Sequence, residues 1–221
     1  KRIMLDTPDW RGSLAGWLDS LDAIAERPDA EGVVRASLLA DMRPVAGDLA
    51  LGERLRGAML GRLRESSVLL KYMAREATRF SPPLGSFGGL FGGLSVQRDG
   101  PKKGTLDLKR GGVFPVTLGA KVLCVDHGLD AVSTASRLKA LDREGALSTG
   151  LALGLVEACD FLQTLRMRHQ ADQLRQNLPP DNDIRPDGLG AMERDRLRSA
   201  FKLVAEFQSL LFEKYGLRML G

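Results

Sequence analysis

The stretch that decides the fold of this 221-residue chain reads Arg79-Phe80-Ser81-Pro82-Pro83-Leu84-Gly85-Ser86-Phe87-Gly88-Gly89-Leu90, and it closes with Asp107-Leu108-Lys109-Arg110-Gly111-Gly112-Val113-Phe114-Pro115. Glycine and proline interrupt helices, because glycine adopts backbone angles closed to other residues and proline lacks an amide donor. So long an interruption is either a functional surface or a loose loop. Its apolar residues argue against a loose loop, since disordered segments are poor in them; they are Phe80, Leu84, Phe87, Leu90 and Phe91.

Apolar residues recur at helical spacing on both sides of this stretch, which predicts helices. Upstream we expect helices over 14–24, 32–43 and 49–77, the first capped by Ser13 and the last unbroken. Downstream we expect helices over 118–129, from Ser133 or Thr134 to near Gly145, from Ser148 onward, and over 192–215. Residues 94–97 and 105–108 alternate around a turn, which predicts a β-hairpin. The predicted fold class is mainly α: an antiparallel helical bundle with a small β-hairpin in a glycine-rich insertion.

The composition is that of a soluble helical protein. Hydrophobic residues make up 43% of the chain, which is enough for a core. The net charge of +4 is modest, so a nucleic-acid binder, which carries a denser basic stripe, is not expected in spite of the arginines between 54 and 64. Cys124 and Cys159 lie in apolar helical contexts, and we expect reduced core residues. Because neither a signal peptide nor a membrane-spanning run is visible, we expect a cytoplasmic protein.

The sharpest polar cluster lies on the predicted helix after Ser148, where Arg166, Arg168 and His169 share one turn. His169 follows Leu162 by seven residues, so it continues the apolar face of that helix. Polar groups that point inward must pair with other protein groups or meet a ligand. Two alternatives stay open: the cluster binds a ligand, or His169 and Arg166 hydrogen-bond to a loop and hold it. No acidic or thiol partner stands at metal-ligand spacing, so a zinc site is not expected.

Two cations precede two glycines in Lys109-Arg110-Gly111-Gly112. Cationic side chains beside flexible backbone amides suit a phosphate or a carboxylate. The spacing differs from that of a P-loop, and a solvated turn is the alternative interpretation. Arg79, which precedes Ser81-Pro82-Pro83, is either an anion clamp or a cation at the C-terminus of a helix.

A pair of carboxylates one residue apart occurs in Asp181-Asn182-Asp183. Such a pair can hold magnesium in nucleotidyl transfer. That reaction also needs a glycine-serine loop upstream, and residues 177–180 read Asn-Leu-Pro-Pro instead. We therefore interpret this segment as loop and helix-cap residues, and we predict no catalytic and no metal-binding residues in this chain.

Several segments together resemble one family. They are Arg79-Phe80-Ser81-Pro82-Pro83-Leu84-Gly85, Asp107-Leu108-Lys109-Arg110-Gly111-Gly112, Leu165-Arg166-Met167-Arg168-His169-Gln170, Asp181-Asn182 and Ala200-Phe201-Lys202. Their order is similar to that in the C-terminal part of bacterial nucleotidyltransferases that also carry cyclic-nucleotide-binding and CBS domains, whose last module is a nucleotidyltransferase substrate-binding domain. Residues 107–112 also resemble, more distantly, the Lys-Glu-Gly-Pro-Gly-Gly segment in the helical domain of PII uridylyltransferases, but Arg110 stands in place of the glutamate and the proline is missing.

The resemblance implies two parts. Residues 1–47 would be the trailing helices of a nucleotidyltransferase domain, because 9–14 and 43–48 resemble its final part, and residues 48–221 would be the helical substrate-binding domain. The chain begins at Lys1 without methionine, and we expect a fragment of a larger protein. The catalytic glycine-serine loop and carboxylates would lie upstream, so this fragment alone should be inactive and hold no cofactor. Mg²⁺ and a nucleoside triphosphate are expected for the full-length protein.

Two functions follow from these expectations. In the first, the module holds the acceptor or the nucleotide phosphates during nucleotidyl transfer in signal transduction. Its partners would be the upstream nucleotidyltransferase, CBS and cyclic-nucleotide-binding domains and a protein acceptor. Its substrate-binding residues would lie together in one open cleft. These residues are Arg79, Lys109, Arg110, Gly111, Gly112, Arg166, Arg168 and His169. In the second, the chain is a non-catalytic interaction or homodimerisation module that relays a CBS or cyclic-nucleotide signal, and those polar groups pair with one another.

Overall fold

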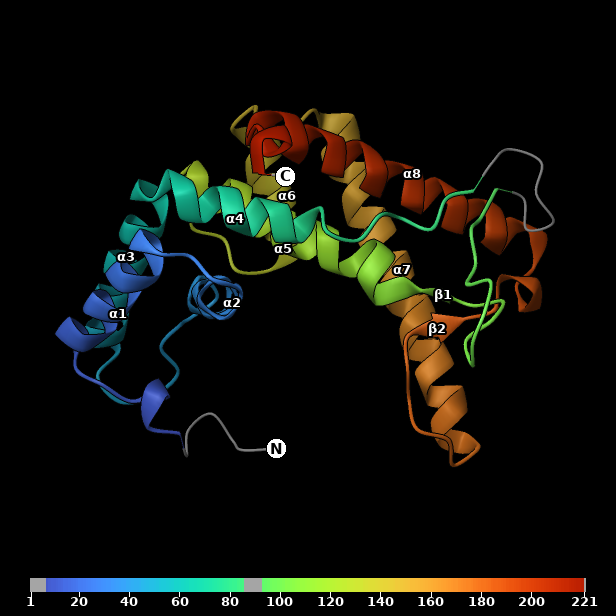
Figure 1. The fold of residues 1–221 in the computed structure, drawn as a ribbon, viewed down its shortest axis with the longest axis horizontal. Coiled ribbons are helices and arrows are strands. Elements are labelled where there is room, and N and C mark those ends of the chain that lie inside the picture. The colour runs from blue at the N-terminus through green and yellow to red at the C-terminus, as the bar shows by residue number, and fades with distance from the viewer. Residues whose placement is uncertain (1–6, 86–92, 221) are drawn as a thin grey trace.

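The computed structural model describes residues 7–85 and 93–220, and over these ranges the chain is mainly helical, as predicted (Figure 1). The apolar residues expected between 86 and 92 lie outside the described ranges. The helices are α1 (Leu14–Glu26), α2 (Ala30–Leu39), α3 (Leu49–Glu65), α4 (Ser67–Ala77), α5 (Phe114–Asp126), α6 (Thr134–Arg143), α7 (Thr149–Arg175) and α8 (Ala191–Lys214). Shorter elements are η2 (Pro8–Trp10), the π-helical turn η3 (Lys109–Val113), β1 (Leu106–Asp107), β2 (Asp183–Ile184), η4 (Pro186–Gly188) and η5 (Leu217–Leu220).

Several helices begin where a short polar side chain caps the first turn. Ser13, Ser133 and Ser148 accept hydrogen bonds from backbone N–H groups three residues further on, as the sequence predicts. Asp29 and Asp48 do the same for α2 and α3. Because these caps satisfy amides that have no partner within the helix, local sequence sets where the helices start.

The helix predicted to run unbroken over 49–77 is divided at Ser66 into α3 and α4. Ser66 leaves helical backbone angles, with φ −91° and ψ 87°, and its Oγ accepts a hydrogen bond from the Leu69 N–H at 3.2 Å. A serine side chain offers the backbone an alternative to the helical ladder, which explains the break. As a result, α3 turns away from α4 (Figure 1).

The predicted β-hairpin differs from the structure in its pairing. Backbone hydrogen bonds between Gln97 and residues 104–105 close the turn over 98–104, but the antiparallel ladder joins β1 to β2, with Leu106 opposite Ile184. Residues 94–95 cannot extend a hairpin, because their backbone pairs with 83–85 instead. This ribbon brings residues 181–183 beside η3.

The core has two parts. The larger cluster joins α1 to α8, and among its fully buried side chains are Leu21, Met73, Leu123 and Phe207. The smaller cluster packs the ribbon and η3 against α7 and α8 through Leu108, Leu162 and Phe201. The smaller cluster therefore fixes the position of the cationic turn.

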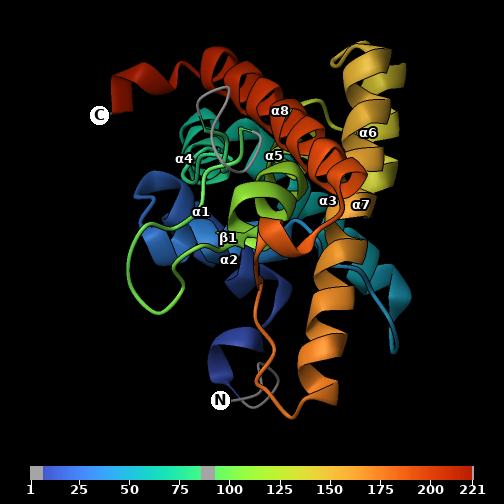
Figure 2. The same ribbon diagram turned by 90° about the vertical axis from the view of Figure 1, so that its right-hand side faces the viewer.

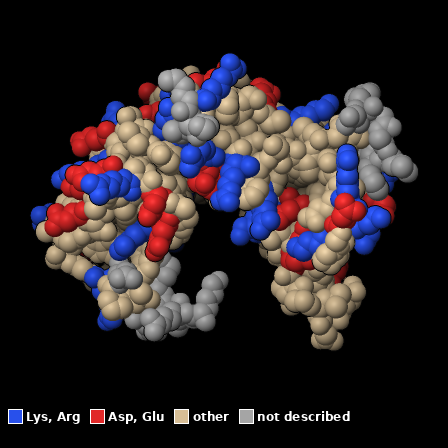
Figure 3. Space-filling model, viewed as in Figure 1, with Lys and Arg blue, Asp and Glu red and all other residues tan. Residues whose placement is uncertain are grey.

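The molecule has the outline of an arch, with α1–α3 at one end and the ribbon with the C-terminal half of α7 at the other (Figure 1). The second view shows the same half of α7 extending beyond its neighbours (Figure 2). Lysine and arginine side chains gather along the roof of the notch between the two ends (Figure 3).

Buried charges join α2 to the rest of the molecule. The Lys121 ammonium and the Arg137 guanidinium each lie 2.6 Å from the Asp41 carboxylate. Arg56 donates a hydrogen bond to the Met42 carbonyl at 2.6 Å. All three cationic side chains are at most 6% exposed. Residues of α1 and α2 thus share one core with the following helices, and the domain boundary at residue 47 stays a prediction.

Candidate functional site

A hollow of about 630 Å³ lies where the turn before β1, the start of η3 and residues 180–183 meet, and we call it the η3 hollow. Phe80 and Phe114 also line it. Its charged lining consists of Lys102, Asp107, Lys109, Arg110, Asp181 and Asp183. The hollow is therefore polar and carries both signs of charge.

The start of η3 is fixed by Asp107. Its Oδ1 accepts hydrogen bonds from the backbone N–H groups of Lys109 at 2.8 Å and Arg110 at 2.9 Å. Its Oδ2 lies 3.7 Å from Arg110 Nε, which partly neutralises that guanidinium. Within residues 7–85 and 93–220, the Lys109 ammonium has neither an ion pair nor a hydrogen bond. Lys109 is therefore an exposed cation in the lining of the hollow that has no protein counter-ion in those ranges.

Gly111 and Gly112 lie buried inside η3 and do not line the hollow. A Cβ on Gly111 would lie 2.6 Å from Pro83 Cδ, and one on Gly112 would lie 2.7 Å from Leu162 Cδ1. Lys109-Arg110-Gly111-Gly112 is thus a packed helical turn rather than the solvated turn considered from the sequence. Its glycines let η3 approach Pro83 and α7 closely, which places the two cations.

Phe80 brings Arg79 and Arg110 together. Their guanidinium carbons lie 5.3 Å and 5.4 Å from the centre of the Phe80 ring, within the range of cation–π attraction. Phe80 also meets Phe114 edge to face, with ring centres 6.3 Å apart. Arg79 itself is paired with Glu76 at 3.2 Å and is not among the residues that line the hollow.

His169 contacts the loop over residues 181–183, as the second of the two alternatives expects of this residue. His169 Nε2 lies 3.1 Å from Asp181 Oδ1, and the Gln173 amide donates to the same oxygen at 3.0 Å. Gln170 Nε2 donates to the Asp181 carbonyl at 3.0 Å. Burial disfavours the charged form of Asp181, but the hydrogen bonds from the Asp183 N–H, Gln173 and His169 outweigh it and lower the pKa of this carboxyl.

The predicted cluster on α7 does not line the η3 hollow, although His169 contacts Asp181 in its wall. Arg168 and His169 line a second hollow of about 700 Å³ that shares only Asp183 with the first. Arg168 is paired with Glu193 at 2.7 Å. Arg166 lines neither hollow, and its Nε is buried without a hydrogen-bond partner in the described residues. The eight predicted site residues therefore do not form a single cleft, and Arg79, Arg110, Arg168 and His169 pair with neighbouring side chains.

Residues 67–215 match the model of the family described as "Putative nucleotidyltransferase substrate binding domain". The chain belongs to this family. Comparison with curated proteins and with solved structures gave no match. All the residues that line the η3 hollow fall within the part of the chain that matches the substrate-binding domain.

One ion pair in the substrate-binding domain was not expected from the sequence. Lys102, on the turn before β1, donates to Asp183 Oδ2 from a position 81 residues away in the sequence. From the local sequence, Lys102 was expected to be an ordinary turn residue and Asp183 an ordinary loop residue. Only the β1–β2 pairing, which no local signal specifies, brings the two together.

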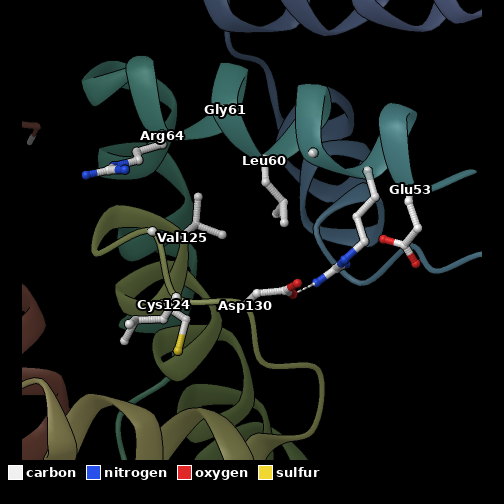
Figure 4. A pocket seen from close by; sticks show the side chains of 11 residues that line it. Glu53, Leu60, Gly61, Arg64, Cys124, Val125 and Asp130 are labelled. Carbon is white, nitrogen blue, oxygen red and sulfur yellow. Dashed lines mark hydrogen bonds and ion pairs between the residues drawn. The ribbon is translucent and has the colours of Figure 1, made fainter. Parts of the chain in front are cut away.

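A further pocket of about 290 Å³ lies outside the η3 hollow, between α3 and the C-terminal end of α5 (Figure 4). Leu60 and Val125 both line it, and Asp130, which also lines it, is paired with Arg56. Burial raises the pKa of the Cys124 thiol to about 11, so this cysteine stays protonated at neutral pH. Cys124 and Cys159 are both free and buried, as the sequence predicts.

Among the described residues, no group of three or more His, Cys, Asp or Glu side chains could hold a metal ion. Of the helices within 7–85 and 93–220, none combines the length and the apolar composition that crossing a membrane requires.

Proposed function

We propose that this chain is the substrate-binding part of a bacterial signal-transduction nucleotidyltransferase, and that the η3 hollow binds an anionic group of one substrate. In this reaction an acceptor, which we expect to be a protein side chain, takes the nucleotidyl group of a nucleoside triphosphate, and pyrophosphate leaves. The observation that supports this most is the Lys109 ammonium, which lacks a counter-ion within the described residues and lies beside Arg110 in the family-matched region.

The charges around the hollow favour an anion at Lys109. Lys102 has Asp183 as its partner and Arg110 has Asp107 nearby, whereas Lys109 has no such partner in residues 7–85 and 93–220. Phosphate and carboxylate oxygens accept strong hydrogen bonds from ammonium and guanidinium groups. Phe80 and Phe114 supply an apolar wall beside these donors, which suits a substrate that carries an organic part next to its anion.

Catalysis itself is not assigned to residues of this chain. We propose that the carboxylates that bind Mg²⁺ and activate the nucleoside triphosphate belong to a nucleotidyltransferase domain of the same cytoplasmic protein. CBS and cyclic-nucleotide-binding domains are proposed as the partners that regulate it. The hollow would then hold the acceptor or the nucleotide phosphates in reach of that domain.

Titration calorimetry of the 221-residue chain with ATP, GTP, CTP, UTP and inorganic phosphate tests the proposal. At least one of these ligands is expected to bind. The double variant Lys109→Ala/Arg110→Ala should weaken binding at least about tenfold, since a hydrogen bond to a charged group is worth roughly 1.5–3 kcal/mol.

The matched control is Lys139→Ala/Arg143→Ala, which removes the same number of charges from exposed positions on α6. This control should bind like the unaltered chain. Equal weakening in both double variants, or no binding of any ligand to the unaltered chain, contradicts the proposed function.

A further inference from the structure

Lys102 reaches the η3 hollow from a segment other than η3. It lies on the turn over 98–104, where Gly100 and Gly104 both adopt φ near +80°. Hydrogen bonds from Gln97 N–H to the Thr105 carbonyl and from Gly104 N–H to the Gln97 carbonyl, both 2.8 Å long, close this turn. The turn therefore has a hydrogen-bonded backbone that fixes the position of the Lys102 backbone, and it is not a loose loop.

Asp183 fixes the direction of the Lys102 side chain. The Asp183 side chain is only 4% exposed, and its Oδ2 accepts the hydrogen bond from Lys102 Nζ. Its Oδ1 is buried and has no hydrogen-bond partner within the described residues. A buried carboxylate needs a cation, and Lys102 is the one paired with Asp183 there. This need holds the ammonium at the wall of the hollow.

The Lys102 ammonium still has donors to offer. An ammonium group carries three N–H donors, and Asp183 takes one of them. The Lys102 side chain is 49% exposed and lines the hollow together with Lys109 and Arg110. The hydrogen bond to Asp183 raises the pKa of Lys102, so the group is charged at neutral pH.

We propose that Lys102 is a further anion-binding residue of the η3 hollow, beside Lys109 and Arg110, that Asp183 is its positioning residue, and that the hollow selects an extended polyphosphate over a single phosphate. This inference rests on the proposed function. Two cationic groups on separate segments, Lys102 on the turn and Lys109 with Arg110 on η3, can each contact a different phosphate of one chain. A single phosphate has fewer oxygens with which to contact both cationic groups at once. Its affinity therefore increases less when both groups are present.

Calorimetry with inorganic triphosphate and with orthophosphate at one ionic strength tests this selectivity. The unaltered chain should bind triphosphate more tightly. Lys102→Met should weaken triphosphate binding about tenfold and orthophosphate binding much less, because one charge-assisted contact is lost. Lys103→Met is the matched control: the neighbouring lysine is exposed on the same turn and does not line the hollow, so its loss should change neither affinity.

Asp183→Asn tests the positioning role. It should lower triphosphate affinity about as much as Lys102→Met does, and the double variant should be no weaker than either single variant, because both changes remove the same contact. Lys102→Arg keeps the charge and should restore part of the selectivity. If Asp183→Asn does not fold, as judged by circular dichroism, the comparison among the Lys102 and Lys103 variants still tests the inference.

The outcomes separate this inference from the proposed function. If Lys102→Met and Lys103→Met behave alike while Lys109→Ala/Arg110→Ala abolishes binding, the role of Lys102 is refuted and the proposed function stands. The same holds if Lys102→Met weakens triphosphate and orthophosphate equally, since selectivity then has another origin. If the unaltered chain binds neither anion nor any nucleotide, the proposed function itself fails.

Discussion

Lys121 and Arg137 are buried cations that share one carboxylate, that of Asp41. Lys121 also donates to the Ser37 carbonyl at 2.7 Å, near the C-terminal end of α2 where backbone carbonyls carry partial negative charge. Burial lowers the pKa of Lys121, and the hydrogen bond and negative charge of Asp41 oppose that shift. At the scale of single residues, Asp41 thus keeps two charges in the interior tolerable.

Asp41→Ala is expected to destabilise the chain by about 3 kcal/mol, because it leaves two buried cations without their carboxylate. Urea denaturation followed by circular dichroism measures the change. The control is Asp22→Ala, which breaks an exposed ion pair to Arg62 and should cost at most about 1 kcal/mol. Similar losses in the two variants would show that the Asp41 contacts add no more than a surface pair does.

At the scale of elements, the position of η3 depends on the close approach of its glycines to neighbouring side chains. Gly112 packs against Leu162 and Phe201, and a Cβ there would lie 2.7 Å and 3.2 Å from their side-chain carbons. Pro83 confines Gly111 in the same way. These contacts, rather than a need for flexible amides, explain the two glycines after Lys109 and Arg110.

Gly112→Ala should therefore destabilise the chain by about 1–3 kcal/mol, the usual cost of overpacking. Gly61→Ala makes the same chemical change in α3, where a Cβ would meet nothing within 4 Å, and it should stabilise by up to about 1 kcal/mol through helix propensity. Urea midpoints of the two variants should thus move in opposite directions. A stabilising Gly112→Ala would contradict the packing argument.

At the scale of the whole molecule, α1 and α2 belong to the larger core. Leu21 and Val33 are buried in one cluster with residues of α4, α5 and α8. The charged contacts of Asp41 and Arg56 add to this joint. The apolar side chains of Val34 and Leu38 are exposed one turn apart on α2. Whether the chain forms a homodimer is not tested by this, so the homodimer stays a prediction.

We expect the chain to unfold in a single transition, because a shared core couples its parts. The two tryptophans of the chain, Trp10 and Trp17, both lie in the N-terminal region, so their fluorescence reports on it, while far-ultraviolet circular dichroism reports on all helices. The two signals should change at the same urea concentration. An earlier tryptophan transition would instead favour residues 1–47 as a separate domain.

The sequence by itself determined the mainly helical class, most helix starts and the family. Those features are local: capping by Ser13 or Ser148 involves residues three apart, and helical spacing of apolar residues involves one turn. Local chemistry also identified Lys109 and Arg110 as cations of a candidate site. One helix start was not predicted, that of α4 after the break at Ser66. This break is also a local feature, but the helical spacing of apolar residues continues through it and hides it.

Only the tertiary structure decided which distant residues meet. His169 lies against Asp181, β1 pairs with β2 rather than with residues 94–97, and Lys102 lies against Asp183. In each case several residues of the chain had suitable chemistry to be the partner. The packing of α7, η3 and the β1–β2 ribbon decides which of them comes within hydrogen-bond distance. Sequence shows that an inward histidine, an alternating segment or a buried carboxylate needs a partner, but the partner is fixed by the shape of the folded core.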